Sequence, residues 1–141
     1  MLKTILVALD GTELSEQVID SLDEVNLQAE TKIILSHVIS PPDEDVEWSA
    51  DRPHGISEEI PYRKVEKQLQ SYQTRLPYES ELEIVTGDPA EEIVRLANIY
   101  HADLIVIGSR GLTGLKRILE RSVSSQVVED APCSVLLVKP R

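Results

Sequence analysis

Short runs of apolar residues alternate along this chain with segments whose apolar residues recur at helical spacing. The apolar runs are rich in β-branched residues, which is typical of strands covered on both faces. Strands that alternate with helices are joined by right-handed crossovers, so the pattern predicts a parallel sheet with helices on both faces. The predicted strands are Thr4–Leu9, Lys32–Ile39, Glu81–Thr86, Leu104–Ile107 and Ser134–Val138. Apolar residues within Leu14–Val25, Val65–Leu76 and Ile93–Tyr100 mark three predicted helices, and a short fourth helix is predicted over Ser122–Glu129.

The expected fold is a single-domain α/β sandwich over residues 1–141, Rossmann-like and doubly wound. Its length of 141 residues suits one domain with a proper core. We expect a five-stranded parallel sheet of order 3-2-1-4-5. In such sheets ligands bind beyond the carboxyl ends of the strands, where the strand order reverses. That reversal falls between the first and fourth strands, so the sequence predicts a ligand crevice between Asp10 and Gly108.

Two connecting stretches carry local signals. Asp88-Pro89-Ala90-Glu91 combines an N-cap Asp, a Pro at the first helical position and a Glu three residues after the cap, which predicts a helix start. Residues 40–59 are acidic and contain several prolines, and we expect a long mobile loop there that could fold over the crevice. The helix after this loop is expected to begin at Pro61.

The charge balance excludes some classes of partner. Asp and Glu number 25 against 14 Lys and Arg, which gives a formal net charge of −11. Such a surface repels nucleic acid and anionic lipid. No apolar stretch approaches the roughly 20 residues of a membrane helix, and the first residues lack a signal-peptide pattern. With Cys133 as the one cysteine, a reducing cytoplasm is the expected compartment, with neither nucleic acid nor membrane as partner.

The segment from Leu104 to Ser124 has the pattern of a nucleotide site. The apolar run stops at Gly108, Gly111 follows three residues later, and hydroxyls stand at Ser122 and Ser124. A buried strand that feeds a glycine-spaced turn, with hydroxyls at the next helix start, presents amide N–H groups to phosphates. The alternative is an ordinary tight turn followed by a serine-capped helix.

The other chemically active side chains have plain structural explanations beside functional ones. Asp10 either caps the turn into the first helix or contacts a ligand. We expect His37 to be a satisfied, partly buried imidazole and Cys133 a small buried hydrophobe. His54 and His101 lack the spacing of zinc ligands. No nucleophile with a base and no carboxylate pair stands out, so nothing argues for catalysis or for a metal.

Several ordered motifs resemble those of the universal stress protein family, and the resemblance covers nearly the whole chain. The most specific is the segment Asp103–Gly111. The other matching segments are Ile5–Thr12, Ser36–Val38, Gly87–Ile93 and Ala131–Val138. One branch of that family binds ATP through Gly, two residues, Gly, nine residues, then Gly-Ser or Gly-Thr. Gly108 and Gly111 match this signature, but Arg121-Ser122 stands where Gly-Ser is expected.

Arg121 therefore leaves three interpretations of the phosphate site open. Its side chain could fill the space that a bare backbone gives to phosphate, in which case AMP would fit better than ATP. Its planar donors could instead meet a phosphate from the side, or the side chain could lie in solvent.

The resemblance implies a set of binding residues for ATP or AMP, with Mg²⁺ if a triphosphate is bound. Asp10 would contact the ribose or adenine side, and the Val38 backbone would read the adenine edge. Amides around Gly108 and Gly111 would hold phosphate with the hydroxyls of Ser122 and Ser124. The full implied set is Ala8, Leu9, Asp10, Val38, Ile107, Gly108, Arg110, Gly111, Arg121, Ser122, Val123 and Ser124.

The expected function is that of a regulatory switch in stress response that binds an adenine nucleotide and acts on an unidentified signalling protein. Two alternatives remain: a nucleotide-free dimeric scaffold, and a slow ATP hydrolase. The last strand, Ser134–Val138, lies at the sheet edge yet is almost wholly apolar. An exposed apolar edge promotes pairing, so a homodimer through this strand is expected, as in family dimers.

Overall fold

The structure is a computed structural model that describes residues 2–10, 13–25, 27–28, 30–39, 54–109 and 123–139. Its strands form one five-stranded sheet of order β3-β2-β1-β4-β5, and all four pairings are parallel. The predicted fold class is confirmed. The strands are β1 (Thr4–Ala8), β2 (Lys32–Ile39), β3 (Ser80–Thr86), β4 (Leu104–Gly108) and β5 (Ser134–Val138); the helices are α1 (Glu13–Ser21), α2 (His54–Arg75), α3 (Pro89–Ile99) and α5 (Val123–Asp130).

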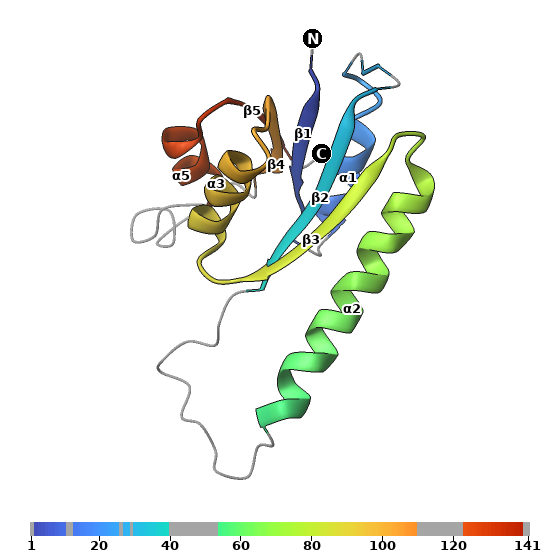
Figure 1. Cartoon of the computed structure of the whole chain (residues 1–141), viewed down its shortest axis with the longest axis vertical. Coiled ribbons are helices and arrows are strands. Elements are labelled where there is room, and N and C mark those ends of the chain that lie inside the picture. Colours follow the sequence, from blue (N-terminus) through green and yellow to red (C-terminus); the bar gives the residue numbers. More distant parts are fainter. Residues whose placement is uncertain are drawn as a thin grey trace.

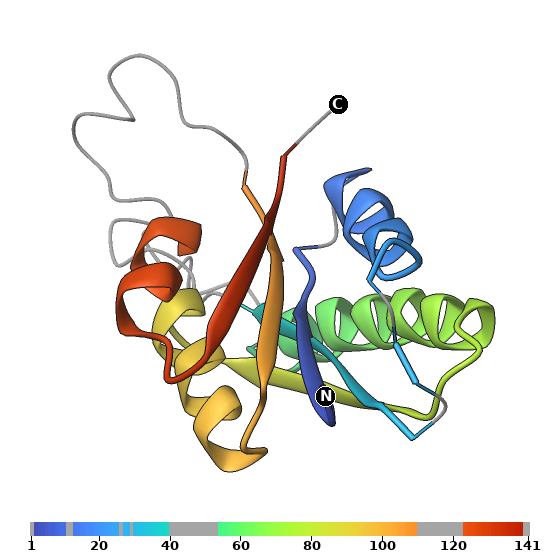
Figure 2. The ribbon, with the colours of Figure 1, turned by 90° about the horizontal axis from the view of Figure 1, so that it is seen from above.

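Helices cover both faces of the sheet, and strand β1 lies in its middle. Figures 1 and 2 show α1 and α2 on one face and α3 and α5 on the other. Side chains alternate along β1, so Ile5 and Val7 enter one core while Leu6 and Ala8 enter the other. Both faces of β1 are closed to solvent, which explains its continuous apolar sequence.

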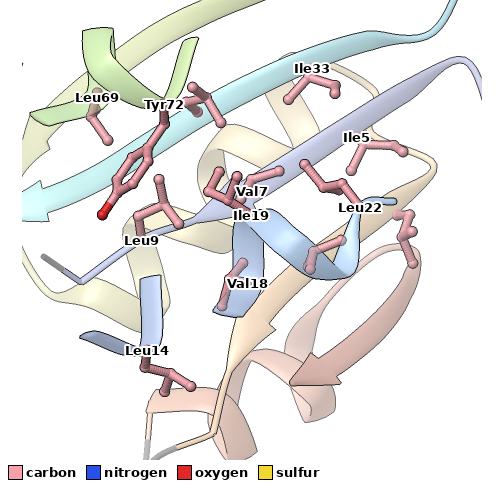
Figure 3. Close-up of a cluster of buried hydrophobic side chains, with 13 residues drawn as sticks. Ile5, Val7, Leu9, Leu14, Val18, Ile19, Leu22, Ile33, Leu69 and Tyr72 are labelled. Atoms are coloured by element: carbon pink, nitrogen blue, oxygen red, sulfur yellow. The ribbon is translucent and has the colours of Figure 1, made fainter. Parts of the chain in front are cut away.

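The core under α1 and α2 joins the two helices to the sheet. Figure 3 shows Tyr72 of α2 beside Leu9, and Leu69 of α2 belongs to the same buried cluster as Val18 and Leu22 of α1. Each fully buried aliphatic side chain of this kind stabilises the fold by about 1.5–3 kcal/mol relative to exposure. This packing holds α1, which begins at Glu13 shortly after the end of β1, against the sheet.

Two helix boundaries differ from the sequence prediction. Helix α1 ends at Ser21, before Val25, because the following residues form tighter i→i+3 bonds such as Leu22 N–H to the Ile19 carbonyl at 3.1 Å. Helix α2 begins at His54, so residues 54–59 are helical and the entry at Pro61 was wrong. An interior proline forfeits one helical hydrogen bond, and the chain here continues through it. Residues 40–53 of the expected loop lie outside the described residues.

The start of α3 follows its sequence signal. The Asp88 carboxylate accepts a hydrogen bond from the Glu91 N–H at 3.0 Å, and Pro89 is the first helical residue. The predicted cap is confirmed. None of the described helices combines the length and the apolar content needed to cross a membrane.

Asp103 ties the starts of β1 and β4 together. Its carboxylate Oδ2 accepts from the N–H groups of Lys3 (2.9 Å) and Thr4 (3.0 Å), and its own N–H donates to the Thr4 carbonyl (2.8 Å). The Thr4 and Lys3 amides stabilise the charged carboxylate, so they hold the pKa of Asp103 below its ordinary value of 3.8.

The two hydrogen bonds that the Asp103 carboxylate accepts predict that part of the stability depends on pH. A lowered folded-state pKa gives stability that is present above about pH 4 and is lost as the pH falls through the folded-state pKa. Asp103→Asn should lower the free energy of unfolding by about 1 kcal/mol at pH 7. Urea denaturation at pH 7 and pH 3 should show that difference shrinking in acid. Asp23→Asn, which alters an exposed acid after α1, is the control, and an equal cost of Asp103→Asn at both pH values would contradict the account.

Candidate functional site

The candidate site lies at the carboxyl edge of the sheet, where the strand order reverses. Strand β1 pairs with β2 on one side and β4 on the other, with Ala8 opposite both Ser36 and Ile107. The next residues along these strands therefore lie together at one edge. They include four predicted site residues, which are Leu9, Asp10, Val38 and Gly108. His37 and Ser109 are direct neighbours of two of them. Helix α1, which follows β1, and helix α5, which follows β4, lie on opposite faces of the sheet. This is the arrangement found around ligand sites in doubly wound sheets.

Asp10 is held at this edge by a residue of α1 that the sequence reasoning missed. The Ser15 hydroxyl donates to the Asp10 carboxylate Oδ1 at 3.2 Å, and the Ser15 hydroxyl oxygen accepts from the Asp10 N–H, also at 3.2 Å. Ser15 is only 1% exposed, whereas Asp10 is exposed. One buried hydroxyl thus fixes both the main chain and the side chain of Asp10. The only sequence signal was a serine beside Leu14, on the apolar face of the helix.

His37 satisfies the main chain of β1 just beyond the end of that strand. Its Nδ1 lies 2.8 Å from the Leu9 carbonyl oxygen, and because a carbonyl can only accept, Nδ1 carries the hydrogen. The Leu9 N–H donates to the Ser36 carbonyl at 2.9 Å. The prediction of a satisfied, partly buried imidazole is confirmed. Leu9 is held through both of its polar main-chain groups.

Gly108 is required by the packing of α1 against β4. A Cβ placed on this glycine would lie 2.5 Å from Cδ2 and 2.7 Å from Cγ of Leu14, closer than side chains approach one another. Among the described glycines, Gly87 and not Gly108 has a positive φ. The close approach that calls for glycine at position 108 is therefore that of a leucine side chain.

The start of α5 supplies two of the predicted residues. Ser124 is 5% exposed and turned into the protein, while Val123 is exposed at the first described helical position. Arg110, Gly111, Arg121 and Ser122, which the sequence assigns to the phosphate end of the site, lie outside the described residues.

Tyr72 brings a buried phenol to the α2 side of the same edge. Its hydroxyl accepts from Gln68 Nε2 at 3.4 Å. Burial, followed by the nearby acids Glu16 and Asp10, raises the pKa of Tyr72 above 10.0. The phenol is therefore neutral at physiological pH and acts here as a packing residue of the core (Figure 3).

The cysteine lies on the other face of the sheet from α1 and α2. Cys133 is partly buried against the core under α3 and α5, and burial raises the pKa of its thiol. Within the described ranges, no three His, Cys, Asp or Glu side chains come together in a group that could hold a metal ion.

Comparison with known proteins decides the family. The family model described as "Universal stress protein family" matches residues 1–139. The chain belongs to the universal stress protein family. A universal stress protein of Thermus aquaticus is 34% identical, with 99% of this chain and 100% of the relative covered. Universal stress protein Sll1388 of Synechocystis is 30% identical, with 96% of each covered.

Other relatives match part of the chain or its fold. Universal stress protein MJ0531 of Methanocaldococcus jannaschii is 43% identical over 77 residues, which are 55% of this chain and 43% of the relative. The solved structure of hypothetical protein MJ0577 has a TM-score of 0.81 and 29% identity, covering 100% of this chain and 98% of that one. A universal stress protein in complex with cAMP has a TM-score of 0.74, 22% identity and coverage of 99% and 98%.

The contact between Gly108 and Leu14 makes a direct prediction. Gly108→Ala should lower the free energy of unfolding by about 1–3 kcal/mol, because the new methyl group overlaps Leu14. In a Leu14→Ala background the overlap is gone, so the same substitution should cost much less. Urea denaturation of the four proteins of this double-mutant cycle measures the coupling. An equal cost of Gly108→Ala in both backgrounds would show that the packing explanation is wrong.

Proposed function

We propose that this universal stress protein binds an adenine nucleotide at the carboxyl edge of β1, β2 and β4 and acts as a regulatory switch in stress response. The observation that carries the proposal is the meeting of Asp10, Val38 and Gly108 at the point where the strand order reverses. The family supports it, as do two proteins of the same fold: one solved in complex with cAMP, and one of Arabidopsis thaliana solved with AMP bound.

The proposed roles follow from the chemistry of each group. The exposed Asp10, fixed by Ser15, accepts hydrogen bonds from ribose hydroxyls. Main-chain groups of Val38 contact the adenine edge, while Ala8, Leu9 and Ile107 form the floor. The amides near Gly108, Arg110 and Gly111, together with Ser122, Val123 and Ser124 at the start of α5, hold phosphate, because a helix N-terminus favours an anion.

Arg121 favours a short nucleotide over a triphosphate. It stands where the family signature has a bare glycine, and we propose that a side chain at this position leaves less room for the outer phosphates. The net charge of −11 adds to the cost of a ligand with more negative charge. We therefore propose AMP as the preferred ligand; ATP, with Mg²⁺, would bind more weakly.

Binding, and not hydrolysis, is the proposed activity. A hydrolase needs a base that positions water at the phosphate. At this edge the Asp10 carboxylate accepts from Ser15, and the His37 Nδ1 hydrogen is used by the Leu9 carbonyl. Both side chains therefore hold the main chain or a neighbouring side chain in place next to the proposed adenosine position. We infer that the protein acts in the cytoplasm, since its one cysteine, Cys133, forms no internal disulfide.

Isothermal titration calorimetry with AMP, ADP and ATP tests the proposal. AMP should bind with a measurable heat and a lower Kd than ATP. Asp10→Ala should weaken AMP binding by about tenfold, because it removes one hydrogen bond to a charged group.

Thr31→Val is the control for loss of stability in that titration. Thr31 is buried, unlike the exposed Asp10, and its hydroxyl donates to the Leu2 carbonyl at 2.9 Å, at the opposite end of the sheet. Its loss should lower stability and leave AMP affinity unchanged. Absence of heat with all three nucleotides would remove the switch proposal and leave the nucleotide-free scaffold.

We also propose that the protein forms a homodimer through β5. Both β3 and β5 are edge strands, but β3 carries Glu81 and Glu83, which discourage pairing with another strand. Strand β5 has four apolar residues in a row after Ser134, and Leu137 is 40% exposed. A two-fold pairing of β5 with its copy would cover this edge and leave the β3 edge in solvent.

Sedimentation velocity tests the dimer. Leu137→Lys should shift the protein to monomers, because the new charge would be buried at the interface. Val128→Lys is the control: Val128 is 49% exposed on α5, outside the strand proposed to pair, and this variant should remain dimeric. A Leu137→Lys protein with unchanged mass would exclude this interface.

A further inference from the structure

The pairing of β1 with β2 ends one hydrogen bond earlier than the strand register allows. In a parallel pair, the N–H of one residue donates to a residue on the partner strand, and its C=O accepts from the residue two further along that strand. The Leu9 N–H donates to the Ser36 carbonyl at 2.9 Å. The regular continuation would therefore bring the Val38 N–H to the Leu9 carbonyl. Instead, the described pairing ends at Ala8 opposite Ser36, and the Leu9 carbonyl accepts from the His37 ring.

The polar main-chain groups of Val38 point toward the β1 side of β2. The Ser36 carbonyl, two residues earlier, accepts from β1, while the Ile39 carbonyl accepts from Gly87 N–H, beyond β3, at 3.1 Å. Main-chain groups alternate between the two edges of a strand, so Val38 shares the direction of Ser36. Beyond Leu9, the chain of β1 turns away toward α1, which begins at Glu13. The Val38 N–H and C=O thus face the carboxyl edge of the sheet.

From these observations we propose that His37 is a positioning residue, whose ring takes the Leu9 carbonyl and so keeps the Val38 N–H available to a ligand at the carboxyl edge. The ring does this from the α2 face of β2, the side of Ile33 and Leu35, while Val38 lies on the opposite face. One side chain therefore ends a strand pairing that the register would otherwise extend.

This role deepens the proposed function and rests on it for the identity of the ligand. One residue with a donor N–H and an acceptor C=O on the same side matches the adenine edge, which offers an acceptor ring nitrogen next to a donor amino group.

Two substitutions separate positioning from simple structural support. His37→Val removes the ring donor but suits a strand, and the Leu9 carbonyl should then accept from the Val38 N–H. His37→Asn keeps an N–H donor close to the position of Nδ1 and should preserve the native arrangement. Amide hydrogen exchange of the free proteins, followed by NMR, reads the state of Val38 directly, with the paired Ser36 amide as internal reference.

The expected result has a signature that loss of stability would not produce. In the native protein and in His37→Asn, the Val38 amide should exchange more than about tenfold faster than the Ser36 amide; in His37→Val it should become protected. AMP affinity should fall about tenfold in His37→Val and be largely retained in His37→Asn. A Val38 amide as protected as Ser36 in the native protein would overturn the inference. An exposed Val38 amide without any nucleotide binding would contradict only the proposed function.

Discussion

The burial of β1 between two neighbouring strands and two layers of helices is the constraint on which the other features depend. Ile5, Leu6 and Val7 are fully buried, so the polar main chain of this segment can reach a ligand only at the ends of β1. At its carboxyl end the chain turns toward α1, and that turn places polar main chain and Asp10 beside the ends of β2 and β4. The same packing that stabilises the domain therefore creates the edge at which we propose that a nucleotide binds.

The fold could be predicted from the sequence because its signals are local and repeated. Apolar β-branched runs gave four strands to within a residue or two, and the alternation in Glu81–Thr86 identified an edge strand. Asp88 and Pro89 marked a helix start that the structure confirms. The predicted start of α2 at Pro61 was wrong, because proline is favoured at the first helical position but a helix can also continue through it, as this one does from His54.

The details of the candidate site could be predicted only in part, because they depend on contacts between distant residues. The position of Asp10 and Gly108 follows from strand order, which the sequence supports. The bond between Ser15 and Asp10, the His37 ring on Leu9 and the Leu14 side chain against Gly108 each require knowledge of how α1 and β2 lie on β1. A glycine that reads as a ligand contact in the sequence is thus first of all a packing contact with a helix.

The most direct test of the account is an NMR titration of the nitrogen-15-labelled protein with AMP, in which the amide signals report the place of binding. The account predicts that the largest shift changes fall at Asp10, Val38, Ser109 and Ser124, around the end of β1, while amides of α2 and of the start of β3 stay unchanged. Saturating AMP that shifts no amide at this edge, or shifts a different surface, would contradict it.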